Sequence, residues 1–332
     1  MGDSEPRSSE DGQTGGAVKQ SRLAAGLALA VALGATGGMS TGCDRLTETT
    51  EAPVAEPPAA EPAQAQPPEK AAPVKQPEPP SLTEWVVSPG NDQPEGEPGH
   101  RLQQTATGIE VCYVPAGTFT MGSADDDRDA FDDERPAHKR RVDAFWIGRT
   151  EVTVGQWRSV MGSVPGKWND QGDDHPVVEV TWHEAVDFCQ RLGLALPTEA
   201  QWEYAARGPE SRRYPWGHEW DPGKCCNHGN AGPGGQTFPV GSLPEDRSWC
   251  GAMDMAGNVF EWCTDWYDED AHVRYARGDL APASVGRYRA VRGASWLNGD
   301  PKNFRAASRN YLREPQNRFA SQGFRCTRRA EQ

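Results

Sequence analysis

Residues 254–262 read DMAGNVFEW and place Asp254, Asn258 and Glu261 around a tight turn at Gly257. Oxygen-rich side chains on a short irregular loop suit a hard cation such as Ca²⁺, because backbone carbonyls can complete its coordination shell. The same run is typical of an ordinary polar turn between core aromatic residues. The residues alone therefore leave both interpretations open.

A second polar group follows the run VRGASW and extends through FRAASR (304–309). Arg305 and Arg309 are four residues apart, so in a helix they would share one face and offer paired donors to a carboxylate or a phosphate. The alternative is that these arginines pair with Glu261 or with other acidic groups and hold loops together. The candidate pocket residues are Arg292, Ser295, Trp296, Asn298, Arg305 and Arg309.

The elements that must position these residues are short. Thr181 and Glu184 form a capping box, and the helix that they begin is expected to end at Gly193. Thr198 and Gln201 begin a second helix in the same way. We further expect a helix within 152–162 and short strands within 117–122 and 145–154. Strands and helices do not alternate over long stretches, which disfavours a doubly wound parallel sheet.

The beginning of the chain predicts export. The apolar run 23–33 is shorter than the roughly 20 residues that span a bilayer, and it is typical of a signal peptide. The following MSTGC resembles a lipoprotein processing site, so we expect a leader over 1–43 with lipidation of Cys43. Ordinary secretion with cleavage nearby and an uncleaved anchor are the alternatives. Each of these readings places the domain outside the cytoplasm.

Residues 44–107 are expected to form a disordered linker rich in Pro, Glu and Ala, and 108–330 the folded domain. The formal net charge of −14, without a basic stripe, disfavours a nucleic-acid partner. The acidic run 124–134 could bind a cation, but a solvated loop is the favoured interpretation.

Several motifs in a set order resemble the formylglycine-generating enzyme family, whose domain is that of the sulfatase-modifying factor. The motifs are VPAGTFTMGS (114–123), ERPAH (134–138), FWIGRTEVT (145–153), LPTEAQWEYAARG (196–208), YPWG (214–217), DMAGNVFEW (254–262), VRGASW (291–296), FRAASR (304–309) and GFRC (323–326). The resemblance implies an α+β fold with a C-type-lectin-like core, few short helices and much irregular structure. It places the candidate pocket residues near the active cleft of relatives.

The resemblance also shows where the family chemistry fails in this chain. Family enzymes use two cysteines after the VRGASW-type turn to bind copper, because soft thiolates select Cu(I). Asn298 stands where the first cysteine is expected, and the second has no counterpart. An amide supplies no thiolate. We therefore expect no copper and no formylglycine generation, and whether the chain is an enzyme stays open.

The family's calcium site does have counterparts. Asp254 and Glu261 match it by side chain, and Gly257 and Val259 match it by carbonyl, so the resemblance implies one Ca²⁺ ion. The matches to the family's first calcium site are poor.

Cysteine usage agrees with export, because seven cysteines besides Cys43 are available for pairing in an oxidising compartment. The family disulfide implies a bond between Cys189 and Cys326. The alternative is two buried free thiols, which pack as small hydrophobic side chains.

Together these features predict an exported cell-envelope lipoprotein, periplasmic or surface-facing, that is held at the membrane by a lipid anchor. Its calcium-stabilised domain would recognise a peptide, a glycan or an envelope protein. The alternatives are an oxidoreductase that uses other residues of the same cleft, and a structural lipoprotein with a vestigial pocket.

Overall fold

Three small sheets and a few short helices make up residues 84–231, 235–309 and 312–330, which are the residues that the computed structural model describes. The predicted leader, Cys43 and the linker up to residue 83 lie outside them. Within the described ranges, none of the helices is both long and apolar enough to cross a membrane.

The largest sheet has five antiparallel strands in the order β1-β2-β3-β6-β10. They are β1 (Trp85–Val87), β2 (Arg101–Gln104), β3 (Glu110–Val114), β6 (Phe145–Gly148) and β10 (Thr327–Arg329). The expectation that the folded domain begins at Gly108 is wrong for residues 84–107, because β1 pairs with β2 and β2 with β3. Both strands are short, with three residues in β1 and four in β2, so their backbone pairing left little signal in the sequence.

Two smaller sheets complete the strand structure. β4 (Gly117–Met121) pairs with β5 (His138–Val142), whereas β7 (Phe260–Trp266) lies between antiparallel β8 (Arg289–Arg292) and parallel β9 (Gln322–Gly323). The three-stranded sheet brings together three sequence motifs that are far apart in the chain. It thereby sets the DMAGNVFEW loop beside the VRGASW turn and the GFRC segment.

The helices begin as the sequence predicts. They are α1 (Val154–Met161), α2 (Trp182–Arg191), α3 (Glu199–Arg207) and α4 (Ala271–Ala276), with 3₁₀ turns at Asp132–Glu134, Pro222–Lys224 and Pro301–Phe304. Capping boxes at Thr181 and Thr198 start α2 and α3, which confirms the prediction for both helices. The helix expected within 152–162 is α1, which Thr153 caps.

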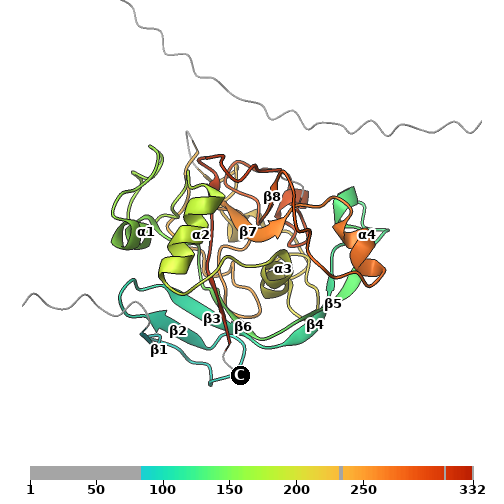
Figure 1. Cartoon of the computed structure of the whole chain (residues 1–332), viewed down its shortest axis with the longest axis horizontal. Coiled ribbons are helices and arrows are strands. Elements are labelled where there is room, and N and C mark those ends of the chain that lie inside the picture. The colour runs from blue at the N-terminus through green and yellow to red at the C-terminus, as the bar shows by residue number, and fades with distance from the viewer. Residues whose placement is uncertain (1–83, 232–234, 310–311, 331–332) are drawn as a thin grey trace, which may run out of the picture. The chain divides into compact units, whose positions relative to one another are not determined.

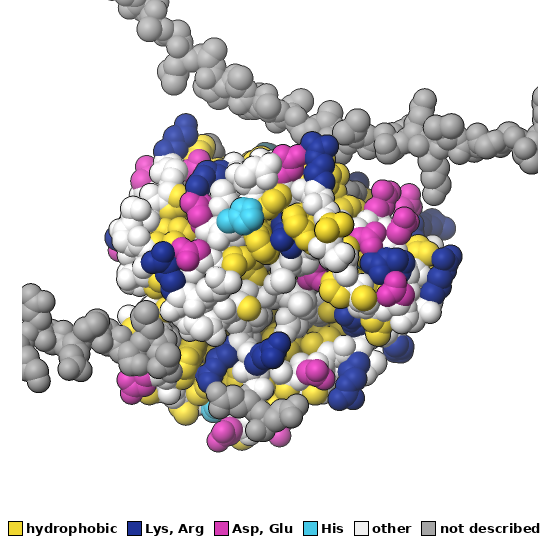
Figure 2. All heavy atoms as spheres, in the orientation of Figure 1, with side chains coloured by type: hydrophobic (Ala, Val, Ile, Leu, Met, Phe, Trp, Pro, Cys, Tyr) yellow, Lys and Arg dark blue, Asp and Glu magenta, His cyan; other side chains and the backbone are white. Residues whose placement is uncertain are grey.

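Helix α3 lies near the centre of Figure 1 and packs against β4, β5, β7 and β8. Trp202 and Ala205 of this helix are fully buried in the core, as expected for its apolar stripe. Glu199 and Glu203 are buried as well, so the central helix carries carboxylates into the interior. On the outside, charged side chains of both signs are scattered over the face in Figure 2. The short elements and long irregular connections confirm the α+β class.

Candidate functional site

The turn that follows β8 is closed by the side chain of Asn298. The backbone reverses through Gly293 and Ala294, both with positive φ. Asn298 Oδ1 then accepts hydrogen bonds from the Ser295 amide at 3.0 Å and from the Ser295 hydroxyl at 3.2 Å. The Asn298 carbonyl accepts from the His228 amide at 2.9 Å. Asn298 therefore fixes the shape of the turn at the position where the family resemblance implies a cysteine.

Trp296 fills the space behind this turn. It is buried against Cys226 and Ala231, and its ring lies 6.4 Å from that of Trp168. A Cβ atom at Gly235 would lie 2.0 Å from the Trp296 ring, so the backbone can approach the indole this closely only with glycine at position 235. Leu297, the next residue, is 52% exposed. The turn thus presents an apolar tip above a tightly packed indole.

Arg292 and Arg309 are used internally by helix α3. Arg292 Nη2 donates to Glu203 at 2.5 Å, and Arg309 binds both oxygens of Glu199 at 3.0 and 2.8 Å. Although burial acts to raise it, Arg292 and Arg207 lower the pKa of Glu203 to about 2. The side chains of Arg292 and Arg309 are each only 1% exposed. The second interpretation of the sequence, that these arginines hold the structure together, applies here, and neither guanidinium is free to meet a ligand.

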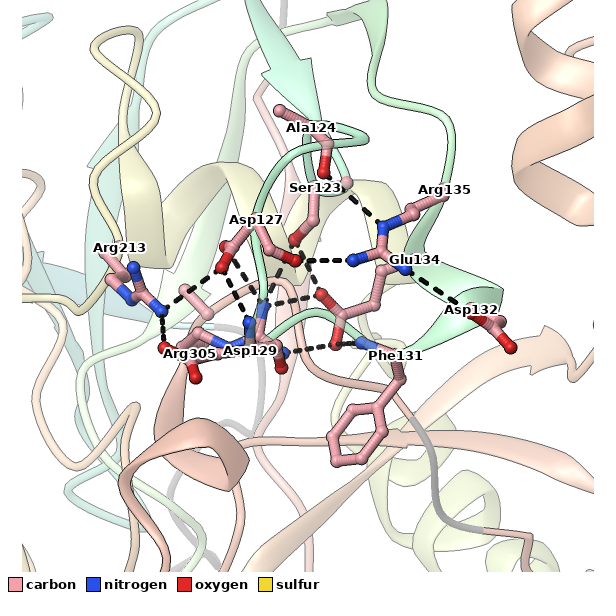
Figure 3. A network of polar contacts seen from close by, with 12 residues as sticks. Ser123, Ala124, Asp127, Asp129, Phe131, Asp132, Glu134, Arg135, Arg213 and Arg305 are labelled. Atoms are coloured by element: carbon pink, nitrogen blue, oxygen red, sulfur yellow. Dashed lines mark hydrogen bonds and ion pairs between the residues drawn. The ribbon is translucent and has the colours of Figure 1, made fainter.

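Arg305 lies in the network that Figure 3 draws. Its guanidinium binds Glu134 through Nη1 at 2.6 Å and Nη2 at 2.7 Å, and Nη1 also contacts Ser123 at 3.2 Å. Arg305 is in an extended conformation after the 3₁₀ turn at Pro301–Phe304, so Arg305 and Arg309 do not share a helix face. The expectation of a paired arginine surface is therefore wrong.

The acidic run 124–134 is likewise not a simple solvated loop. Glu134 is fully buried under Arg305, and Asp127 and Asp129 bind Arg213 on the other side of the same network (Figure 3). Sequence reasoning missed this arrangement because the partners lie more than 80 residues apart, and charge alone does not say which residues meet.

The loop of residues 254–261 is held by Arg325 of the GFRC motif. Arg325 Nε and Nη2 bind the two oxygens of Glu261, each at 2.6 Å, and Nη2 also donates to the Asp254 carbonyl at 3.2 Å. Trp202 Nε1 donates to Glu261 as well, at 2.8 Å. Both Glu261 and Arg325 are fully buried. The guanidinium of Arg325 therefore neutralises the carboxylate of Glu261.

This arrangement fits a calcium ion poorly. Asp254 Oδ2 accepts from the Gly241 amide at 2.6 Å, and both Glu261 oxygens are engaged by donors. Within the described ranges, no group of three or more His, Cys, Asp and Glu side chains is arranged to hold a metal ion. Of the four predicted ligands, Glu261 is the one whose oxygens are both engaged, by the guanidinium of Arg325.

The cysteine side chains in the described part of the chain are buried. Cys189 and Cys326 lie side by side with their sulfur atoms 3.4 Å apart, longer than the roughly 2.05 Å of a disulfide. The two cysteines that the resemblance pairs therefore lie next to each other, and the disulfide bond between them stays a prediction. Near the Asn298 turn, burial raises the pKa of Cys226 to about 12 and raises that of Cys225 further. These thiols are poor sources of thiolate.

Comparison with known proteins identifies the domain. Residues 97–330 match the family described as "Sulfatase-modifying factor enzyme 1-like domain". The chain is 31% identical over 298 residues to the formylglycine-generating enzyme of Streptomyces coelicolor, covering 71% of this chain and 94% of that enzyme. The chain belongs to the sulfatase-modifying factor family. The resemblance of its ordered motifs is thereby confirmed.

Other proteins similar to this chain extend the comparison. The hercynine oxygenase of Mycolicibacterium thermoresistibile is 33% identical over 257 residues, and the match covers 64% of this chain but only 56% of that relative. Among solved structures, PvdO from Pseudomonas aeruginosa aligns with a TM-score of 0.61 and 28% identity, covering 70% of this chain and 99% of PvdO. Treponema denticola variable protein 1 aligns with a TM-score of 0.57 and 25% identity, covering 67% and 95%. These likenesses confirm the predicted fold of the family.

The Arg305–Glu134 pair makes a first prediction. Changing Arg305→Leu leaves the Glu134 carboxylate buried without its cation, so we expect unfolding to become easier by about 3–5 kcal/mol. Urea denaturation followed by circular dichroism measures the loss. The exposed pair Arg191–Asp187 is the control, and Arg191→Ala should cost less than about 1 kcal/mol. A similar small effect of both changes would contradict a structural role for Arg305.

Asp265 makes a second prediction, which concerns pH. Burial, and then the neighbouring Glu199 charge, raise the pKa of Asp265 from 3.8 to about 6. Because the folded state holds this proton more tightly, the stabilisation is complete below about pH 4 and is lost as pH rises through about 6.

The variant Asp265→Asn carries no such proton. Relative to this variant, the native chain should lose up to about 3 kcal/mol of stability between pH 4 and pH 7. Denaturant titrations of both proteins across this range provide the measurement. A stability difference that does not change with pH would show that Asp265 titrates normally.

Proposed function

We propose that this member of the sulfatase-modifying factor family is a recognition domain and does not generate formylglycine. The observation that carries the proposal is Asn298, which stands in place of the family's first copper-binding cysteine. Its amide oxygen is committed to two hydrogen bonds with Ser295 at 3.0 and 3.2 Å. The position therefore supports the shape of a turn and supplies no soft ligand for copper.

The surface around the turn supports recognition. The exposed Leu297 stands beside Asn298, and Trp296 and Trp168 lie beneath them. An apolar tip on a rigid aromatic base suits a peptide, a glycan or an envelope protein, because little ordering is needed on binding. The arginines of the predicted pocket take no part, since their partners are internal.

The second candidate is an oxidoreductase of the same family that uses other cleft residues. The names of the relatives favour it, because they include a formylglycine-generating enzyme and a hercynine oxygenase. The local residues weigh against it, since the Cys226 thiol behind the turn is buried and its pKa is raised to about 12.

A conversion assay tests whether the chain generates formylglycine. The purified full chain is incubated with Cu(I), oxygen and a sulfatase-type CxPxR peptide, and the peptide is analysed by mass spectrometry. We expect the cysteine to remain unchanged, because no thiolate pair is available to bind copper. The Streptomyces coelicolor relative serves as the positive control. Formylglycine in the peptide would contradict the proposal and require another catalytic residue.

We include a calcium site in the proposal only because the family resemblance implies one. Asp254, Gly257 and Val259 would have to hold the ion while Glu261 is shared with Arg325. If calcium binds there, the unfolding temperature should rise with millimolar CaCl₂ and fall with EDTA, by mass action on the folded state. Unchanged unfolding in both solutions, with Asp254→Asn as the matched variant, would contradict a calcium site.

We further propose export and lipid anchoring at Cys43, in a periplasmic or surface-facing position. Radiolabelled palmitate fed to a bacterial expression host should enter the chain and should not enter the Cys43→Ala variant. Release of an unlabelled chain into the soluble fraction would contradict the anchor and leave ordinary secretion.

A further inference from the structure

A basic cleft lies away from the turn at Asn298. It has a volume of about 550 Å³, and four arginines from separate segments of the chain line it. They are Arg101, Arg149, Arg212 and Arg247. Trp249 and Asp92 also line the cleft. None of the residues of the Ser295–Asn298 turn takes part, so this cleft is independent of the function proposed above.

The positive charge of the cleft is only partly neutralised by the protein. Arg101 and Arg149 share a single carboxylate, Glu110, at 3.5 and 2.8 Å. Arg212 pairs with Glu210, whose side chain is 69% exposed, at 3.1 Å. Such an exposed pair is screened by water and weak. One carboxylate for two guanidiniums leaves the inner wall with a surplus positive charge.

Arg247 adds a further charge at the mouth. It is exposed, and its side chain makes no ion pair or hydrogen bond with any other residue in the described part of the chain. Asp92 is the acidic residue on the lining, and it is also exposed. A cleft that gathers cations in a chain of net charge −14 focuses a local positive potential, which attracts anions.

The walls of the cleft are built to stay open and rigid. Gly99 and Gly251, both with positive φ, meet back to back, and a Cβ at Gly251 would lie 3.5 Å from the Gly99 Cα. Trp249 is fixed by a hydrogen bond from its Nε1 to the Tyr204 carbonyl at 2.8 Å. The backbone and the indole that line the cleft are therefore held in place, which lowers the ordering cost of binding.

We propose that this cleft binds a small hydrophilic ligand carrying two or more sulfate or phosphate groups. Guanidinium groups match these oxyanions because they donate two parallel hydrogen bonds in a planar fork. A single sulfate or phosphate ester has too few free oxygens to give each of the four guanidiniums a bidentate contact. A polyanion neutralises the surplus charge of Arg101 and Arg149 and engages Arg212 and Arg247 at the mouth.

Calorimetric titration of the full chain tests this assignment. The probes are a trisulfated heparin disaccharide, inorganic pyrophosphate and, as the neutral control, the unsulfated disaccharide. We expect saturable binding of one or both anionic probes, weakened by added salt, and none of the neutral one. The stronger probe tells whether sulfate or phosphate esters are the natural source.

Variants locate the binding. Arg247→Ala and Arg212→Ala should each weaken the affinity by about tenfold, the effect expected for a lost charged hydrogen bond. Arg277→Ala removes an equally exposed charge elsewhere, so it should leave the affinity within about twofold. Thermal unfolding checks that each variant is folded. Absence of saturable binding, equal binding of the neutral sugar, or equal weakening by Arg277→Ala would overturn the proposal.

Discussion

Buried arginine–carboxylate pairs hold this domain together. A guanidinium or a carboxylate that leaves water carries a penalty of several kcal/mol, which only a close, hydrogen-bonded partner offsets. The fold meets this requirement through Arg292 with Glu203, Arg309 with Glu199, Arg305 with Glu134 and Arg325 with Glu261, each with side chains at most 6% exposed. Because each pair joins segments distant in sequence, the pairs fix long irregular connections that short helices and strands could not fix.

Helix α3 explains why so many loops meet in one place. Its carboxylates at Glu199 and Glu203 point into the core and bind Arg309 and Arg292, the last residue of β8. Trp202, between them, donates to Glu261, which in turn binds Arg325. One short helix thereby links the motifs that identify the family. The candidate functional turn at Asn298 stands at the outer end of this rigid frame.

Much of the fold could be predicted because its signals are local. The capping boxes at Thr181 and Thr198 name the starts of α2 and α3 from residues three positions apart. Strands β1 and β2 could not be predicted in this way, since their stability comes from the backbone pairing of β1 with β2 and of β2 with β3.

In the candidate site, too, local features could be predicted and contacts between distant residues could not. The sequence shows Asn298 where the family resemblance implies a copper-binding cysteine, and in the fold its side chain closes the turn through hydrogen bonds from Ser295. The roles of Arg305 and Arg309 depend on partners 171 and 110 residues away, Glu134 and Glu199. A sequence reveals the charges of such residues, and only the folded chain reveals which charges meet.

A double-mutant cycle on Arg309 and Glu199 tests this account most directly, with the free energy of unfolding measured by urea titration. We expect Arg309→Met to cost about 3–5 kcal/mol, and the double variant Arg309→Met, Glu199→Gln to recover a substantial part of that loss. An arginine that serves a ligand would behave differently. If Arg309→Met stays within about 0.5 kcal/mol of the native chain, as surface substitutions do, the structural role of these arginines is contradicted.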